Sequence, residues 1–174
     1  MRANQTHGVD TRDRLINSAV GLLHSHGYRS VGVKALCESA GVQKGSFYHF
    51  FSSKEDLTLT AVERSWQLLR DEVIEPVLAG TEDAAQRIRE IRQACLGPVG
   101  ANHSDPHWPH PCIFGRLAAS ITETEPALRI RLAEIFAEWA DLMGGGTQGW
   151  TALADIFGRL VLAFTVDSPE VLEA

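Results

Sequence analysis

Residues 33–51, VKALCESAGVQKGSFYHFF, decide the fold of this chain. The pattern predicts a short helix over residues 33–40, a turn at Gly41 and a second short helix over residues 44–50. Glycine suits the turn because it adopts left-handed backbone geometry without steric cost. Two short helices joined in this way are typical of a helix-turn-helix, whose second helix enters the major groove of DNA. The stretch therefore predicts double-stranded DNA as a partner.

The second short helix carries side chains that suit a DNA surface. Gly45 leaves its first turn bare, so backbone N–H groups could approach a phosphate closely. The neighbouring hydroxyl, imidazole and ammonium groups can donate hydrogen bonds to phosphates or base edges. Phe47, Phe50 and Phe51 are expected in the core instead. We predict DNA contacts from Lys34, Gln43, Lys44, Gly45, Ser46, Tyr48, His49 and Lys54.

The net charge of −6 conceals an uneven distribution. Residues 1–56 carry seven Lys or Arg and five acidic side chains, whereas residues 57–174 carry nine and seventeen. A basic region on an acidic remainder is compatible with DNA binding, because only the contacting face must attract phosphate. We therefore expect a DNA-binding head over residues 1–56 and an acidic body over residues 57–174.

The rest of the chain is predicted to be all-α. Ser53 should cap a long helix whose inner face carries Leu57, Ala61, Leu68, Leu69 and Val73, with an end or kink at Pro76. Further helices are expected from Thr81 to residue 96, where Gly97-Pro98 stops the first, and over residues 111–122, 126–143 and 150–166. The last of these is apolar nearly all round. Such a helix needs cover on both sides, and a partner subunit would provide it.

The head resembles the DNA-binding region of the TetR family of bacterial regulators. The resemblance rests on Gly27-Tyr28, on AGVQKG at residues 40–45, on FYHFF at residues 47–51 and on SKEDL at residues 53–57. It implies an all-α protein of about nine helices, with a helix-turn-helix head and a body for ligand binding and dimerisation. It also implies a cytoplasmic homodimer that binds a palindromic operator as a repressor and is released by an unknown small molecule. Val31-Gly32 replaces the family's usual Thr-Ser, which removes a helix cap.

The body resembles the family more loosely, through residues 111–120 and 125–129. It is similar to a subgroup with a cysteine at the start of the sixth helix, although Pro111 here replaces the customary glycine. Aromatic, aliphatic and thiol side chains of the body could line an effector pocket, although plain core packing is the simpler interpretation of each. These candidates are Trp66, Leu69, Cys95, Trp108, Cys112, Phe114, Phe136 and Trp139.

Cys112 supports two further hypotheses beside an inert buried thiol. A helix N-terminus and the nearby His110 would lower its pKa and favour a thiolate that reacts with electrophiles. Alternatively, residues 103–112 supply ligand types that suit zinc or nickel, although their spacing matches no standard site. These are His103, Asp105, His107, His110 and Cys112. The same segment could also be a lid over the ligand cavity.

Other classes of protein find little support in the sequence. No apolar run approaches the roughly 20 residues needed to span a bilayer, so no membrane association is expected. Three cysteines without a CxxC pair indicate reduced thiols. Neither a nucleophile motif nor a phosphate-binding loop occurs, so we expect no enzyme, no metal and no cofactor. A helical protein-interaction adaptor that keeps the head as a relic is the remaining alternative.

Overall fold

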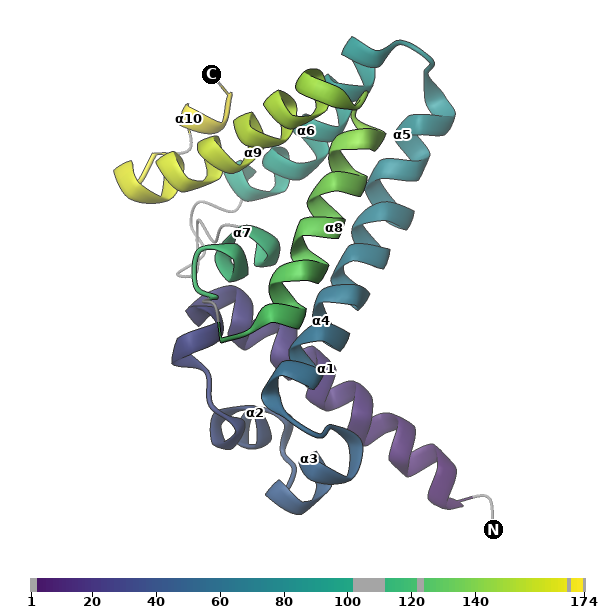
Figure 1. The fold of residues 1–174 in the computed structure, drawn as a ribbon, viewed down its shortest axis with the longest axis vertical. Helices are drawn as coiled ribbons and strands as arrows, with labels where there is room; N and C mark the ends of the chain where they lie inside the picture. Colours follow the sequence, from purple (N-terminus) through teal and green to yellow (C-terminus); the bar gives the residue numbers. More distant parts are fainter. Residues whose placement is uncertain (1–2, 102–111, 122–123, 169, 174) are drawn as a thin grey trace.

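The computed structural model describes residues 3–101, 112–121, 124–168 and 170–173, and within these ranges every element is helical (Figure 1). The segments α4, η1 (a π-helical segment) and α5 follow one another without a break and form one continuous helical rod. Counting this rod as one helix, the described residues form nine helices, as expected. The elements are α1 (Ala3–Ser30), α2 (Val33–Ala40), α3 (Lys44–Phe50), α4 (Lys54–Leu69), η1 (Arg70–Ile74), α5 (Glu75–Gly80), α6 (Ala84–Ala101), α7 (Ile113–Ala118), α8 (Pro126–Leu142), α9 (Gly146–Val166) and α10 (Glu170–Glu173).

The helices α1, α2 and α3 lie together at one end of the molecule, and α4 leads from them into the body. There α8 runs alongside α4, while α6, α9 and α10 gather at the far end (Figure 1). The short helix α7 lies between the carboxyl end of α1 and the body. This arrangement makes α1, α4 and α7 the elements that join head to body.

Local signals account for the helix ends in the head. Gly27 has a φ of 74°, so α1 is kinked there, and it continues to Ser30. Gly41 is left-handed, with a φ of 63°, and its N–H donates to the carbonyl oxygens of Cys37 and Glu38. Gly32 gives α2 no side-chain cap, as its sequence implied. Ser53 caps α4, since its Oγ accepts from the Asp56 N–H at 3.0 Å.

The helical winding of the rod changes just before Pro76, where the sequence predicted an end or a kink. Its helix widens into η1 just before α5, and Pro76 occupies the first turn of α5, where its missing N–H is tolerated. The wide turn inserts a residue, so Ile74 is fully buried in place of Val73. The inner position of Leu68 was also wrong: its side chain is 50% exposed, because it lies about 200° around the helix from the buried Trp66.

Three other helices have boundaries that differ from expectation. The helix α6 begins after Asp83, whose Oδ1 accepts from the Gln86 N–H, and it passes through Gly97 and Pro98 to Ala101. Gly97 has no positive φ and therefore does not interrupt the helix. The helix α7 is shorter than predicted. By contrast, α9 begins four residues early, directly after the left-handed Gly144 and Gly145.

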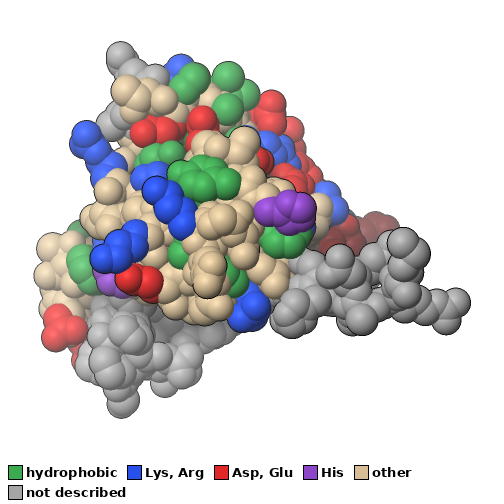
Figure 2. Space-filling model, turned by 90° about the horizontal axis from the view of Figure 1, so that it is seen from below, with side chains coloured by type: hydrophobic (Ala, Val, Ile, Leu, Met, Phe, Trp, Pro, Cys, Tyr) green, Lys and Arg blue, Asp and Glu red, His purple; other side chains and the backbone are tan. Residues whose placement is uncertain are grey.

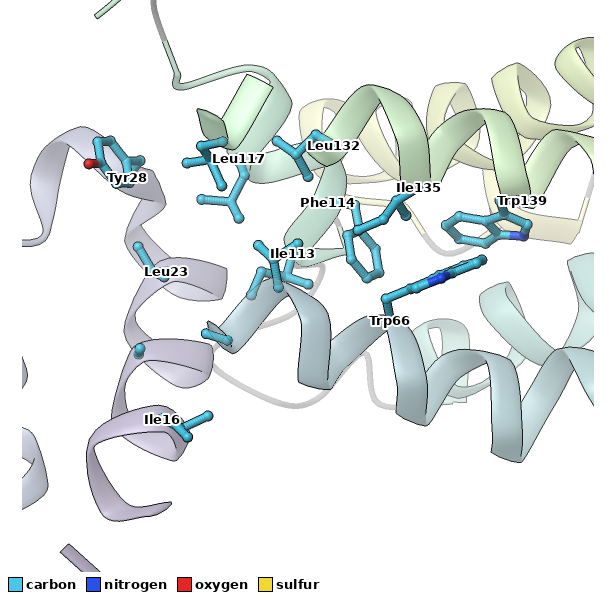
Figure 3. Packing of buried hydrophobic residues seen from close by; sticks show 14 of the residues in the cluster. Ile16, Leu23, Tyr28, Trp66, Ile113, Phe114, Leu117, Leu132, Ile135 and Trp139 are labelled. Atoms are coloured by element: carbon cyan, nitrogen blue, oxygen red, sulfur yellow. The ribbon is translucent and has the colours of Figure 1, made fainter. Parts of the chain in front are cut away.

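The body is built around a cluster of aromatic side chains. The ring centroids of Trp66, Phe114 and Trp139 lie 5.8–6.2 Å apart, and all three side chains are buried (Figure 3). Beside this cluster the backbones of α8 and α9 come into close contact where the two helices cross. They are so close that a side chain at Gly149 would collide with the carbonyl of Ala140. The body core is therefore closely packed and depends on a small residue at the crossing.

Candidate DNA interface and interior of the body

The helix α1 fixes the helix-turn-helix through two side chains. Arg14 Nη1 donates to the carbonyl of Ala40 at 3.2 Å, next to the turn. Ser18 Oγ donates to the carbonyl of Leu36 at 3.1 Å in a buried position. Phe47 of α3 and the following Phe51 are buried in the head core, as predicted, whereas Phe50, which was also expected there, is only partly buried against it. With its inner face held by these aromatic rings, α3 presents its opposite face to solvent.

The outward face of the head holds most of the predicted DNA contacts. Tyr48 is 52% exposed, and Lys44 Nζ lies 5.8 Å from the centre of its ring. Seen from below, this face shows several Lys and Arg side chains, with acidic side chains mostly at its margin (Figure 2). The half-buried Ser46 and a group of exposed residues share this part of the head: Lys34, Gln43, Lys44, Gly45, Tyr48 and His49.

Lys54 differs from the other two lysines. Its Nζ donates to the carbonyl of Tyr28 at 3.0 Å and lies 3.7 Å from the centre of the Tyr28 ring. Burial lowers the pKa of Lys54, and the charge of Glu125 opposes that shift. The same surroundings raise the pKa of Tyr28 to about 12, mainly through burial. The Lys54 ammonium, predicted to contact DNA, thus contacts Tyr28 in this structure.

The predicted pocket liners that the structure describes lie in the body core or are packed against it. Trp66, Phe114 and Trp139 fill the interior against each other, while Leu69, Cys95, Cys112 and Phe136 are partly buried. Trp108 lies outside the described residues. Phe136 lines a cavity of about 270 Å³, together with Ala118, Ile121, Arg129, Leu132 and Ala133.

The thiolate predicted at Cys112 is contradicted by its surroundings. Burial raises the pKa of Cys112 to about 11, and the N–H groups of Phe114 and Gly115 offset this only in part. The pKa of Cys95 is about 12, through burial and the neighbouring Cys112. Both thiols are therefore protonated near neutral pH.

The metal hypothesis rests mostly on residues that the structure does not describe. His103, Asp105, His107 and His110 lie outside the described ranges. Among the residues that are described, no three His, Cys, Asp or Glu side chains are grouped as metal ligands.

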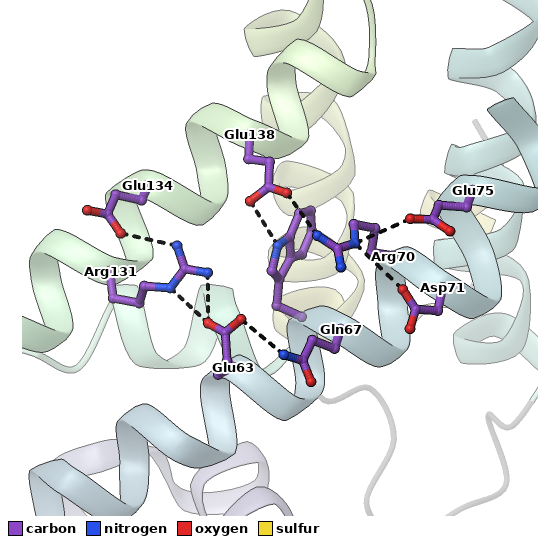
Figure 4. Close-up of polar contacts among 9 residues, drawn as sticks. Glu63, Gln67, Arg70, Asp71, Glu75, Arg131, Glu134 and Glu138 are labelled. Atoms are coloured by element: carbon purple, nitrogen blue, oxygen red, sulfur yellow. Dashed lines mark hydrogen bonds and ion pairs between the residues drawn. The ribbon is translucent and has the colours of Figure 1, made fainter.

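Separate groups of ion pairs that the sequence did not reveal join α8 to α4 and η1 (Figure 4), and another pair joins α4 to α1. Arg131 binds Glu63 at 2.7 Å and Glu134 at 3.1 Å. Glu138 accepts from the indole N–H of Trp66 at 3.0 Å and pairs with Arg70. Arg64 pairs with Asp13 of α1 at 3.0 Å. Partners so far apart in sequence leave no local signal.

A groove that the sequence also did not reveal runs between α1, α4 and α8. Its volume is about 620 Å³. It is lined by Arg12, Asp13, Ile16, Leu59, Thr60, Glu63, Arg64, Gln67, Ala127 and Arg131.

Known proteins match both the sequence and the fold. The family profile described as "Bacterial regulatory proteins, tetR family" matches residues 15–61. The transcriptional repressor NemR of Escherichia coli is 32% identical over 144 residues, which cover 83% of this chain and 65% of NemR. The regulator LmrA of Bacillus subtilis is 28% identical over 134 residues, which cover 76% of this chain and 69% of LmrA.

Two solved structures illustrate the similarity in fold. SCO4454, a TetR-family regulator from Streptomyces coelicolor, superposes with a TM-score of 0.75 at 18% identity and covers 99% of this chain and 89% of its own. A cysteine mutant of the TetR-family regulator CifR, solved with a 26-bp operator, gives 0.73 at 22% identity over 92% and 91%.

The helix-turn-helix on a helical body defines the class of this molecule, a DNA-binding transcriptional regulator. Residues 15–61 belong to the TetR family, and the fold of the chain is that of solved TetR-family regulators.

Proposed function

We propose that this protein is a cytoplasmic repressor that binds a near-palindromic operator as a homodimer. The outward face of α3 supports this proposal most directly. Lys44, Tyr48 and His49 are exposed on a helix whose inner side is anchored by Phe47. A short helix held in this way can enter the major groove while its side chains reach phosphates and base edges. In this reading, residues 1–56 bind DNA, and residues 57–174 bind the effector and the partner subunit.

The exposed face of α9 supports the homodimer. Isolated exposed apolar residues are ordinary, but here they cluster along one helix, which is typical of a protein interface. The sequence was expected to contain no apolar stretch long enough to span a bilayer, but among the described helices α9 alone is long and apolar enough by length and composition, and 33% of that stretch is buried. A four-helix bundle of α8 and α9 with their copies would cover the remainder. The exposed side chains are Trp150, Val161, Leu162, Phe164 and Val166, each 46–56% exposed.

The effector is proposed to be a small molecule that binds in the body near the aromatic cluster. Its binding would favour one head separation over another, and two heads one helical turn of DNA apart must lie about 34–36 Å from each other. A coupling of about 1–3 kcal/mol between the two sites is enough for such release. A thiol-responsive mechanism has less support, because burial raises the pKa of Cys112.

The proposal is tested by two variants with separate expected effects. Lys44→Ala combined with Tyr48→Ala should lower operator affinity about hundredfold, since each contact to DNA contributes on the order of 1–3 kcal/mol. Its mass in solution should remain that of a dimer. Leu162→Glu should yield a monomer, because a charge in an apolar interface is not compensated. Retention on the chain's own upstream DNA and light scattering measure the two effects.

Arg89→Ala removes an exposed charge of the body and serves as the control, which should leave both readouts unchanged. Full operator affinity in the Lys44 and Tyr48 variant would contradict the assignment of α3. A dimeric Leu162→Glu protein would contradict the α9 interface.

A further inference from the structure

The cavity of about 270 Å³ lies where the carboxyl end of α7 meets the first part of α8. Among the described residues that line it, Arg129 supplies the only charge, and the other five are apolar. This composition is typical of ligand sites, in which apolar walls hold the body of the ligand and a few polar groups fix its orientation. The apolar lining residues are Ala118, Ile121, Leu132, Ala133 and Phe136.

Small side chains leave the cavity open, and an aromatic ring connects it to the interior of the body. Ala118 and Ala133 are exposed, so a ligand can enter from solvent. The ring of Phe136 meets that of Phe157 edge to face, with 5.3 Å between their centroids. The Phe157 ring in turn lies 5.7 Å from that of Trp139. The cavity therefore adjoins the aromatic cluster, and Phe136 offers a flat aromatic ligand an edge or a face to pack against.

The charge of Arg129 is left without a carboxylate partner. Its side chain is exposed, and within the part of the chain that the structure describes no Asp or Glu pairs with it. Glu134 of the same helix pairs with Arg131 at 3.1 Å. Glu125 lies close enough to Tyr28 for its charge to help raise the pKa of Tyr28. Arg129 also lies near the amino-terminal end of α8, where the helix dipole favours an anion over a cation.

We propose that this cavity binds a small aromatic monocarboxylate, with its ring against Phe136 and its carboxylate held by Arg129. A guanidinium can bind a carboxylate through two parallel N–H···O bonds, which fixes the orientation of the ligand. The volume limits its size: at about 30 Å³ for each water molecule, the cavity matches a molecule of roughly ten non-hydrogen atoms. The inference names the class of effector that the proposed function leaves open, and for the effector role it rests on that function.

Titrations followed by NMR without DNA test the site with two probes. Cinnamate is an aromatic monocarboxylate of this size, and cinnamamide is its neutral counterpart. The unaltered protein should bind cinnamate with a Kd of about 0.1 mM, as expected for so small a ligand. Arg129→Gln should weaken cinnamate binding about tenfold and leave cinnamamide binding within about twofold, because the amide has no charge to pair. Arg89→Gln removes an exposed charge outside the cavity and should change neither affinity.

Filling the cavity provides an independent test of its location. Ala133→Trp should abolish the binding of both probes, and the exposed position of Ala133 allows the larger side chain without disturbing the core. Ala85→Trp is the control, because it adds the same ring at an exposed site of α6 outside the cavity. The amide spectrum shows that each variant remains folded. Equal cinnamate affinity in the unaltered protein, Arg129→Gln and Ala133→Trp would overturn the inference.

A second copy of the chain is the competing occupant of this surface. If the partner covered the cavity, the Leu162→Glu monomer would bind cinnamate and the unaltered dimer would not, which would refute the site in the assembled protein. As an effector, cinnamate should weaken operator binding by the unaltered protein at least fivefold. Unchanged operator affinity at saturating cinnamate would refute the effector role. If the unaltered protein binds no operator, the proposed function fails while the titrations without DNA still decide the site.

Discussion

The head exposes polar side chains on its recognition helix, whereas the body buries its aromatic side chains and exposes apolar ones. In the head, α3 buries Phe47 and turns Tyr48 and His49 outward. In the body, Trp66 and Trp139 face each other inside, and the exposed part of α9 is apolar. The two regions are both helical, but the head offers polar groups that suit a polyanion and the body offers a surface that suits another protein. Substitutions in the head should therefore change binding more than stability, and substitutions in the body should do the reverse.

The largest expected effect breaks the body while sparing the outward face of α3. Gly149→Ala should lower the free energy of unfolding by about 3 kcal/mol, because the added methyl group meets the backbone of Ala140 and neither helix can yield without moving the other. Urea denaturation measures this loss. The dimer should weaken as well, since α9 would shift.

Gly21→Ala is the control for that change. Gly21 lies within α1 with no atom within 4 Å of an added methyl group. Alanine should raise stability by about 0.5–1 kcal/mol at such a site. A Gly149→Ala protein as stable as Gly21→Ala would show that α8 and α9 can separate at little cost.

A second, intermediate effect concerns the interior thiol of the body. With its pKa at about 11, Cys112 should react with iodoacetamide at pH 7.5 about a hundredfold more slowly than an ordinary cysteine, because far less thiolate is present. Mass spectrometry of the alkylated protein provides the rate. Labelling as fast as that of free cysteine would restore the thiol-sensor hypothesis.

The same pKa predicts how stability varies with alkaline pH. The folded state raises the pKa of Cys112 from 9.0 to about 11, so its protonated form is favoured in the folded protein. This contribution is fully present below about pH 9 and is lost as the pH rises through 11. Cys112→Ala should make the decline in the free energy of unfolding with rising pH less steep over that range.

The smallest expected effect belongs to the head. Gly32→Ser should add the missing cap to α2 and raise stability by a few tenths of a kcal/mol, which corresponds to about 1 °C in Tm. The site has open space and an extended backbone, so serine fits without strain. Ser53→Ala, which removes an existing cap, should shift Tm the other way by a larger amount. A gain of several degrees from Gly32→Ser would mean that α2 limits the stability of the whole chain.

The sequence predicted the head closely, because its signals are local. The bounds of α2 and α3 are those expected, since Gly41 and the spacing of Phe47 and Phe51 act within a few residues. The direction of Lys54 could not be foreseen in the same way. It depends on Tyr28, which lies 26 residues away and reaches Lys54 only through the kink at Gly27.

In the body, the same local reasoning was less successful. Gly97-Pro98 was expected to stop α6, but the helix continues through both residues. The local preference of glycine and proline to end a helix therefore did not decide its end. The hypothesis of a low pKa for Cys112 rested on its helix N-terminus, whereas burial has the largest influence on that pKa and raises it. The ion pairs of Arg131 and Arg64 join helices that no sequence pattern pairs.

The widened turn at η1 has a consequence for insertions and deletions. A single-residue deletion in an ordinary helix rotates everything beyond it by about 100° and would expose a buried face. Within Arg70–Ile74 the rod already contains one residue more than a regular helix requires. Removing one residue there would restore regular geometry and leave Trp66 and Ile74 on the same side. This segment is therefore where the rod could be shortened with the least disturbance to its flanks.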